Sequence, residues 1–317
     1  MKIILVTPAL PRSRAGNRAT AIRWRNILAE LGHKVDVVTE YTGGRYDAMV
    51  ALHAWRSASS IRHFHARWPD RLLVVALTGT DLYKFIRTSP EPTLYSIHVA
   101  DLLVTLHDLA GLAIPERYRE KITVIHQSAK PAVRKPAKSR ARFRVCVIGH
   151  LREEKDPLRA AYAVRRLPAG SRIEVNQYGK AHTRVWAERA ETEMRNNARY
   201  RWHGEVPHWQ VRRVYATADL MVLSSRMEGG ANVISEACVA GLPTVASDIA
   251  GSVGLLGKDY PAYYPVGDTR ALREMLLRAE AEPAWLEKLR VSSQARVGLF
   301  SHERERRSWK RLLAKAA

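Results

Sequence analysis

The sequence has little cysteine and no long hydrophobic run. Its two cysteines, Cys146 and Cys238, lie in a strand-like and a helix-like apolar pattern. We therefore expect two reduced core residues and no C-x-x-C zinc or redox motif. No apolar stretch approaches the roughly 20 residues that a membrane-spanning helix needs. Pro8 and Pro11 interrupt the apolar start, which we interpret as a buried first strand rather than a signal peptide. These features predict a cytoplasmic protein without stable membrane insertion.

Acidic residues are also scarce. The 317 residues include 31 Asp or Glu against 52 Lys or Arg, a formal net charge of +21. Such a charge attracts nucleic acid, anionic membranes or small phosphorylated substrates, unless it is only a solvated basic surface. Arginine is scattered along the chain instead of forming one dense tract, which disfavours nucleic acid as a partner. The 46% of hydrophobic and 26% of charged residues are typical of a globular protein.

Apolar, strand-like runs alternate with helix-like segments almost throughout the chain. The predicted strands are residues 2–7, 34–40, 47–53, 72–79, 102–107 and 122–127, followed by 144–149, 172–179, 200–204, 220–225, 243–247 and 262–265. Helices are expected at residues 18–31, 55–67, 157–167, 183–196 and 233–240. Continuous apolar strands that alternate with helices predict parallel sheets covered on both faces. The expected fold class is therefore α/β, with two doubly wound, Rossmann-like domains facing a cleft.

A segment rich in proline, lysine and arginine separates the two series of strands. Residues 130–142, KPAVRKPAKSRAR, show no apolar periodicity, which is typical of a linker. We therefore predict an N-terminal, acceptor-side domain over residues 1–138 and a C-terminal, nucleotide-sugar-binding domain over 139–300. The last helical pattern, residues 301–317, adds no strand, and we expect it to pack back across the domains.

The strongest functional signal runs from Glu228 to Ser247, EGGANVISEACVAGLPTVAS, after the strand-like run LMVLSS. Small residues at 229–231 allow close approach of the backbone. The helix expected after Asn232 offers free N–H groups, an anion site suited to a diphosphate. Glu236, one turn further on, offers a carboxylate that can accept two hydrogen bonds from a ribose diol. An acidic first turn favoured by the helix dipole would explain one glutamate but not the whole string.

This segment carries a family resemblance. The spacing from Glu228 to Glu236 is the E-x7-E spacing of family 4 retaining glycosyltransferases, which have the GT-B fold, and GGANVISEACVAGLPTVAS resembles their donor motif. The resemblance implies that Glu236 holds the donor ribose and that Glu228 acts catalytically at the transferred sugar. It also assigns to the donor site five of the seven residues between the two glutamates, namely Gly229, Gly230, Ala231, Asn232 and Val233.

A second signal is VCVIGHLREEKDP, residues 145–157. A predicted strand ends at Gly149, and Arg152 and Lys155 follow it. In the family that the donor motif resembles, the corresponding G-x-x-R/K-x-x-K segment grips the donor diphosphate. The resemblance implies that these two cations stabilise the leaving nucleotide without a metal; a helix-capping charge cluster is the alternative. No D-x-D metal motif occurs, so we expect no metal and no cofactor besides the UDP-sugar co-substrate.

The first loop, TPALPRSRAGNRATAIRWR, joins a predicted strand to a predicted helix. Gly16 lies where the N-terminal domain of such enzymes covers the diphosphate. The loop also carries Arg12, Arg14 and Arg18, although a helix dipole disfavours cations at a helix start. The three cations therefore predict a bound anion, at a site that includes Asn17.

The acceptor half departs from the common family pattern. Thr78, in LTGTDLY, stands where ordinary family members have a histidine before the glycine, and VIHQSAKP, residues 124–131, replaces the usual IPNGVD. We assign Thr78, Gly79 and Thr80 to an acceptor anion. His53 ends another predicted strand, and we consider both a direct catalytic role and a structural one for it.

Several N-terminal segments together resemble the selenosugar synthases of selenoneine biosynthesis, which are short family 4-like enzymes. These segments are TPA-x-PRSRAGNR-x-TA-x-RW, VALHA-x-RSA-x-S and VALTGTDLY, and the resemblance extends over most of the chain. It implies selenophosphate as the acceptor and UDP-N-acetylglucosamine or UDP-glucose as the donor. The arginine-rich loop suits a small, multiply charged anion. Selenium is a strong nucleophile with less need of a general base, which agrees with Thr78 in place of the histidine.

Three other functions are weighed against this one. An ordinary family 4 hexosyltransferase would act on a lipid, polysaccharide or small-molecule hydroxyl. A nucleic-acid binder would need aromatic residues interleaved with basic ones on one face. A nucleotide-sugar epimerase could use the same fold.

Overall fold

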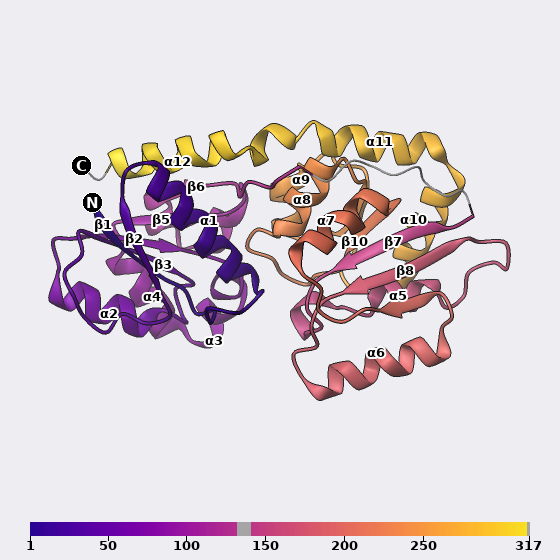
Figure 1. Cartoon of the computed structure of the whole chain (residues 1–317), viewed down its shortest axis with the longest axis horizontal. Helices are drawn as coiled ribbons and strands as arrows, with labels where there is room; N and C mark the ends of the chain where they lie inside the picture. Colours follow the sequence, from indigo (N-terminus) through magenta and orange to yellow (C-terminus); the bar gives the residue numbers. More distant parts are fainter. Residues whose placement is uncertain (132–140, 316–317) are drawn as a thin grey trace. The chain divides into compact units, whose positions relative to one another are not determined.

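The structure is a computed structural model and describes residues 1–131 and 141–315. It divides into two compact units (Figure 1). The N-terminal unit comprises Met1–Ser128, Glu228–Asn232 and Leu299–Ala317, and the C-terminal unit comprises Ala129–Met227 and Val233–Gly298. The predicted domain boundary and most of the predicted linker fall within residues 132–140, outside the described residues. Residues 228–232, which lie within the range predicted for the C-terminal domain, group with the N-terminal unit.

The N-terminal unit is built on a six-stranded parallel sheet of order β2-β1-β3-β4-β5-β6. Its strands are β1 (Lys2–Val6), β2 (Lys34–Val38), β3 (Ala48–Leu52), β4 (Leu72–Ala76), β5 (Leu102–Thr105) and β6 (Ile122–Val124). Its helices are α1 (Gly16–Glu30), α2 (Ala58–Arg67), α3 (Ile86–Thr88), α4 (Pro90–Val99) and α12 (His302–Ala314), with a π-helical turn at Asp81–Phe85.

Helices cover both faces of this sheet because its central strands, β1, β3 and β4, are apolar at nearly every position. Along β1, Ile3 and Leu5 pack into one core cluster with α1 and α12, and Ile4 and Val6 pack into a second cluster with α2 and α4. This is the period of two expected of a strand buried on both sides. The C-terminal helix α12 lies beside α1 (Figure 1). There Trp309 meets Trp24 edge to face, with ring centroids 4.9 Å apart.

The C-terminal unit contains a second six-stranded parallel sheet, of order β12-β11-β10-β7-β8-β9. Its strands are β7 (Phe143–Ile148), β8 (Ile173–Tyr178), β9 (Tyr200–Trp202), β10 (Leu220–Leu223), β11 (Thr244–Ser247) and β12 (Tyr263–Tyr264). Its helices are α5 (Arg159–Val164), α6 (Arg184–Asn196), α7 (His208–Thr217), α8 (Asn232–Ala240), α9 (Ala250–Leu256), α10 (Thr269–Ala281) and α11 (Pro283–Gln294).

The two sheets confirm all twelve predicted strands and the α/β class. The core positions of the cysteines are also confirmed, because Cys146 in β7 and Cys238 in α8 are both free and buried. Burial raises the pKa of each thiol to about 12, so both stay protonated and unreactive. No helix within the described residues is both long enough and apolar enough to span a bilayer.

Candidate functional site

Each sheet reverses its strand order once, and the predicted site segments follow the strands at that point. In the N-terminal unit β1 lies between β2 and β3, and in the C-terminal unit β7 lies between β8 and β10. In sheets of this kind, ligands bind beyond the carboxyl ends of the strands where the order reverses. The predicted Arg-rich loop follows β1, His53 follows β3, Gly149 follows β7, and Glu228 lies in the loop after β10.

The loop after β7 carries Gly149, Arg152 and Lys155. It lies so close to the loop after β8 that a Cβ at Gly179, where φ is +149°, would come 2.0 Å from the carbonyl oxygen of Gly149. Only glycine fits at position 179. The Nε of Arg152 is buried without a hydrogen-bond partner among the described residues, and Oε2 of Glu154 lies 4.0 Å away. A buried guanidinium N–H in that state is suited to an anionic oxygen.

Two side chains of α7 hold the carboxylate of Glu236, a residue of α8. The hydroxyl of Tyr215 donates to Oε2 at 2.8 Å, and Nε2 of His208 lies 3.2 Å from Oε1. The hydrogen bond with Glu236 raises the pKa of His208 above its ordinary 6.5, although burial opposes this. Burial raises the pKa of Tyr215 well above 10.0, so its hydroxyl remains a donor. An ionised carboxylate has roughly four acceptor positions, so Glu236 keeps capacity for further hydroxyl donors.

Within the N-terminal unit, the glycines of the Glu228–Asn232 loop lie against the ends of β4 and β5. A Cβ at Gly229 would come 2.2 Å from the carbonyl carbon of Thr78, and one at Gly79, where φ is +132°, would come 2.7 Å from the nitrogen of Gly229. A Cβ at Gly230, where φ is +144°, would come 2.3 Å from the Cβ of Leu106. The structure thus brings predicted donor-sugar residues against the predicted acceptor segment.

The acceptor segment is held by Asp81, a buried carboxylate. Its oxygens accept hydrogen bonds from the backbone N–H groups of Thr78 at 3.0 Å, Gly79 at 2.7 Å and Ala54 at 3.1 Å. A single carboxylate therefore joins the loops that follow β3 and β4. Sequence reasoning missed Asp81, although an aspartate two residues after a glycine commonly bonds the backbone of its own turn.

The imidazole of His53 is buried and its tautomer follows from its neighbours. Its Nδ1 accepts from the backbone N–H of Arg56 at 3.2 Å, so the proton is on Nε2, which donates to Oγ1 of Thr80 at 2.8 Å. Nδ1 also lies 3.9 Å from the carboxylate of Asp81. His53 has a φ of +74°, an uncommon conformation for a residue other than glycine that is found preferentially at functional sites. In this arrangement His53 is a hydrogen-bond donor toward Thr80 rather than a base.

The first-loop arginines differ in their surroundings. Arg12 and Arg14 are exposed, whereas Arg18 is half-buried, with a buried Nε that has no hydrogen-bond partner in the part of the chain that the structure describes. Gly16 and Asn17 form the first turn of α1, whose N–H groups point out of the helix and favour negative charge. Of the three predicted anion-binding arginines, Arg18 therefore has the surroundings that best suit an anion.

The predicted site residues are distributed over both units. The N-terminal unit contains Arg12, Arg14, Gly16, Asn17, Arg18, His53, Thr78, Gly79, Thr80, Glu228, Gly229, Gly230, Ala231 and Asn232, and the C-terminal unit contains Gly149, Arg152, Lys155, Val233 and Glu236. Across residues 1–131 and 141–315, no group of three or more His, Cys, Asp or Glu side chains is arranged to hold a metal ion.

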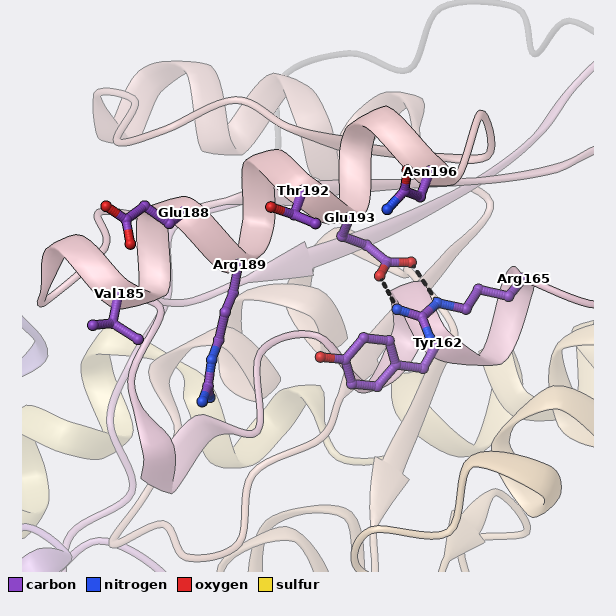
Figure 2. Close-up of a pocket in the computed structure, with 8 residues that line it drawn as sticks. All are labelled: Tyr162, Arg165, Val185, Glu188, Arg189, Thr192, Glu193 and Asn196. Carbon is purple, nitrogen blue, oxygen red and sulfur yellow. Dashed lines mark hydrogen bonds and ion pairs between the residues drawn. The ribbon is translucent and has the colours of Figure 1, made fainter.

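A groove between α5 and α6 of the C-terminal unit lies outside this set (Figure 2). It is lined by Tyr162, Arg165, Val185, Glu188, Arg189, Thr192, Glu193 and Asn196. The guanidinium of Arg165 pairs with the buried carboxylate of Glu193, with Nε 3.0 Å from Oε1 and Nη2 on Oε2. The amide of Asn197 donates to the same carboxylate at 2.9 Å. We interpret this groove as a helix-packing contact, because its buried carboxylate, Glu193, is already satisfied by Arg165 and Asn197.

Comparison with known proteins gives a family match and one partial relative. Residues 130–295, just over half of the chain, match the family described as "Glycosyl transferases group 1". A proposed teichuronic acid biosynthesis glycosyltransferase of Bacillus subtilis is 37% identical over 82 residues. That match spans 26% of this chain and about a fifth (21%) of the relative's length.

The fold resembles solved structures over almost the whole chain. HepE of Anabaena, crystallised with UDP and glucose, has a TM-score of 0.79 at 15% identity, covering 99% of this chain and 100% of that one. Sucrose-phosphate synthase of Thermosynechococcus elongatus has a TM-score of 0.82 at 15% identity, covering 99% and 98%. At such identities the likeness establishes the fold alone, and it confirms the predicted two-domain α/β fold of the GT-B type.

Proposed function

Because the chain belongs to the group 1 glycosyl transferases, we propose that it transfers the sugar of a UDP-sugar and that its acceptor is selenophosphate. The observation that carries the proposal is the backbone contact of Gly229 with Thr78 and Gly79. It puts the segment proposed to hold the donor sugar beside the segment proposed to hold the acceptor. Support for UDP comes from the Anabaena structures, which contain UDP with glucose or UDP-glucose. The acceptor rests on the resemblance to selenosugar synthases and on the arginines of the first loop.

In the proposed reaction, selenium attacks the anomeric carbon of the donor as the bond from that carbon to the diphosphate oxygen breaks. The electron pair leaves with UDP, and Arg152 and Lys155 stabilise its charge. Water then cleaves the Se–P bond, which releases phosphate and leaves a 1-seleno sugar. His53 contributes as a donor toward Thr80, because its hydrogen bonds place the proton on Nε2.

The remaining residues bind the substrates in this proposal. Glu236 accepts hydrogen bonds from the ribose, and Glu228 contacts the transferred sugar with Gly230, Ala231 and Asn232. The donor is further lined by Gly16, Gly149, Gly229 and Val233. The acceptor phosphate is bound by Arg12, Arg14, Asn17, Arg18, Thr78, Gly79 and Thr80.

Mass spectrometry of the products tests this function directly. Purified protein is incubated with UDP-glucose or UDP-N-acetylglucosamine and selenophosphate, with thiophosphate as the comparison. We expect UDP and a 1-seleno sugar, both dependent on the enzyme. A protein that ignores selenophosphate but glycosylates a hydroxyl acceptor would instead have the second candidate function, hexosyl transfer to a hydroxyl. The partial match to the Bacillus protein favours that candidate.

Chelation tests the leaving-group assignment. Turnover is expected to survive EDTA, because Arg152 and Lys155 supply the positive charge that a divalent cation would otherwise supply at the diphosphate. Rates with and without chelator are compared at matched ionic strength. Turnover that stops with EDTA and returns with magnesium or manganese would contradict this role for the two cations.

Alanine variants of the first loop test the acceptor site. We expect Arg18→Ala to raise the KM for selenophosphate by roughly tenfold, more than it raises the KM for the UDP-sugar, because one charge-assisted hydrogen bond is worth about 1.5–3 kcal/mol. Arg12→Ala and Arg14→Ala should act in the same direction but less, because both side chains are exposed. Added salt should weaken acceptor use in parallel.

Arg25→Ala is the matched control for this series. Arg25 is an exposed cation of the same helix, and its guanidinium bonds the neighbouring Asn26. It should leave both KM values unchanged. If all three first-loop variants raise only the KM for the UDP-sugar, the loop binds the donor diphosphate and does not bind the acceptor.

A further inference from the structure

Two side chains from distant parts of the chain, Arg23 and Gln127, converge on the amide of Asn232, the first residue of α8. Nη2 of Arg23, from α1, donates to Oδ1 of Asn232 at 3.1 Å. The amide of Gln127, oriented with its nitrogen toward Asn232, donates to the same Oδ1 at 2.9 Å and to the carbonyl of Gly230 at 3.3 Å. In that orientation the oxygen of Gln127 accepts from Arg23 at 2.8 Å and from Thr20 at 2.6 Å.

The guanidinium of Arg23 is in turn held by Glu305 of α12. Nε of Arg23 lies 3.2 Å from Oε1 of Glu305, whose side chain is 0% exposed. The same carboxylate accepts from Nε1 of Trp24 at 2.8 Å and from the backbone N–H of Ser128 at 2.8 Å. A buried carboxylate with this many donors is fixed in place, and it is a strong anchor for the cation beside it.

This arrangement determines how the amide of Asn232 is turned. Its oxygen accepts two hydrogen bonds on the side of α1 and Gln127, so its Nδ2 must point elsewhere. Nδ2 lies on the side of Gly16, 3.8 Å from where a Cβ of residue 16 would be. The amide nitrogen therefore lies beside the start of α1, where the first N–H groups of a helix have no intrahelical acceptor and favour negatively charged or polar oxygens.

We propose that Arg23, Gln127 and Glu305 are positioning residues that lock the Asn232 amide so that its Nδ2 donates hydrogen bonds to oxygen atoms of the transferred sugar. The proposal rests on the proposed UDP-sugar function and names groups that recognise the sugar. None of the three positioning residues is among the residues that the family resemblance assigns to the donor site. Arginine is required at position 23 because its guanidinium bonds two acceptors at once, Glu305 through Nε and Asn232 through Nη2. A lysine has one nitrogen and cannot bridge both in this geometry.

Isothermal titration calorimetry with UDP and with a UDP-sugar separates recognition of the sugar from recognition of the nucleotide. The ligand is whichever of UDP-glucose and UDP-N-acetylglucosamine the wild type binds more tightly. Asn232→Asp keeps the shape and strengthens the contact with Arg23, but it removes both N–H donors. We expect this variant to lower the affinity for the UDP-sugar tenfold or more and to change the affinity for UDP by no more than about twofold. We also expect it to raise the melting temperature.

Arg23→Lys tests the link to α12, with Arg25→Lys as the matched control on the exposed side of the same helix. We expect Arg23→Lys to lower the affinity for the UDP-sugar about fivefold, with little effect on the affinity for UDP. The control should bind both ligands as the wild type does. A structural role alone would lower the melting temperature of Arg23→Lys and leave the ratio of the two affinities unchanged.

The outcomes distinguish this inference from the proposed function. A wild type that binds the UDP-sugar, with Asn232→Asp and Arg23→Lys binding it equally well, overturns the inference and leaves the function standing. A wild type that binds neither UDP nor either UDP-sugar overturns the proposed function, and the inference with it.

Discussion

The Gly229→Ala variant is expected to lose turnover by about 100-fold or more and to unfold at a lower temperature. An added Cβ would lie 2.2 Å from the carbonyl carbon of Thr78 and 2.3 Å from the nitrogen of Gly79. Both atoms belong to the backbone, so no flexible side chain can move aside. Overpacking of this kind typically costs about 1–3 kcal/mol. A displacement of roughly 1 Å at a reacting centre can cost about 100-fold in rate.

The measurements are kcat/KM with the UDP-sugar and the melting temperature. Gly170→Ala is the control, because a Cβ at Gly170 would meet nothing within 4 Å, and it should behave as the wild type. Full turnover in Gly229→Ala would mean that the Glu228–Asn232 loop does not need its contact with Thr78 for catalysis. The contact of Gly229 with Thr78 and Gly79 would then no longer support the proposed function.

The Glu236→Gln variant is expected to lose tenfold or more in affinity for UDP with little change in fold. The loss follows because hydrogen bonds to a charged acceptor are worth about 1.5–3 kcal/mol each, and each 1.4 kcal/mol is a factor of ten. Glutamine keeps an oxygen for the hydroxyl of Tyr215, which donates to Glu236 at 2.8 Å. Glu236→Ala should lose the same affinity and also stability, because it leaves that buried hydroxyl without its acceptor.

The titration of His208 gives an independent measurement on the same variant. Its pKa is raised above 6.5 because Glu236 accepts its hydrogen bond. Removing the negative charge should therefore lower that pKa, which is measurable from the imidazole NMR shifts of wild type and Glu236→Gln. Unchanged UDP affinity together with a lowered His208 pKa would show that Glu236 is held as described but does not contact the nucleotide.

The elements of the fold, and the strands after which the predicted site segments follow, could be predicted from the sequence alone. Runs such as FRVCVI in β7 and LMVL in β10 are apolar at nearly every position, and that pattern is local, so it shows in the sequence without any knowledge of partners. The glycines that follow these strands can likewise be recognised in the sequence without any knowledge of their partners. The parallel arrangement followed from the alternation of strands with helices, because parallel strands need crossover connections.

Which of these segments meet depends on tertiary packing and could not be predicted from the sequence. The Glu228–Asn232 loop lies with the N-terminal unit, against Thr78 and Gly79, although it follows a strand of the other sheet. Arg23 bonds a residue 209 positions away and another 282 positions away. Such contacts leave no periodic pattern and no characteristic spacing in the sequence, because they depend on how separate elements pack. In the sequence, nothing distinguishes Asp81, Arg23 and Glu305 from ordinary surface charges. Packing buries Asp81 and Glu305, and it gives each of the three its hydrogen-bond partners.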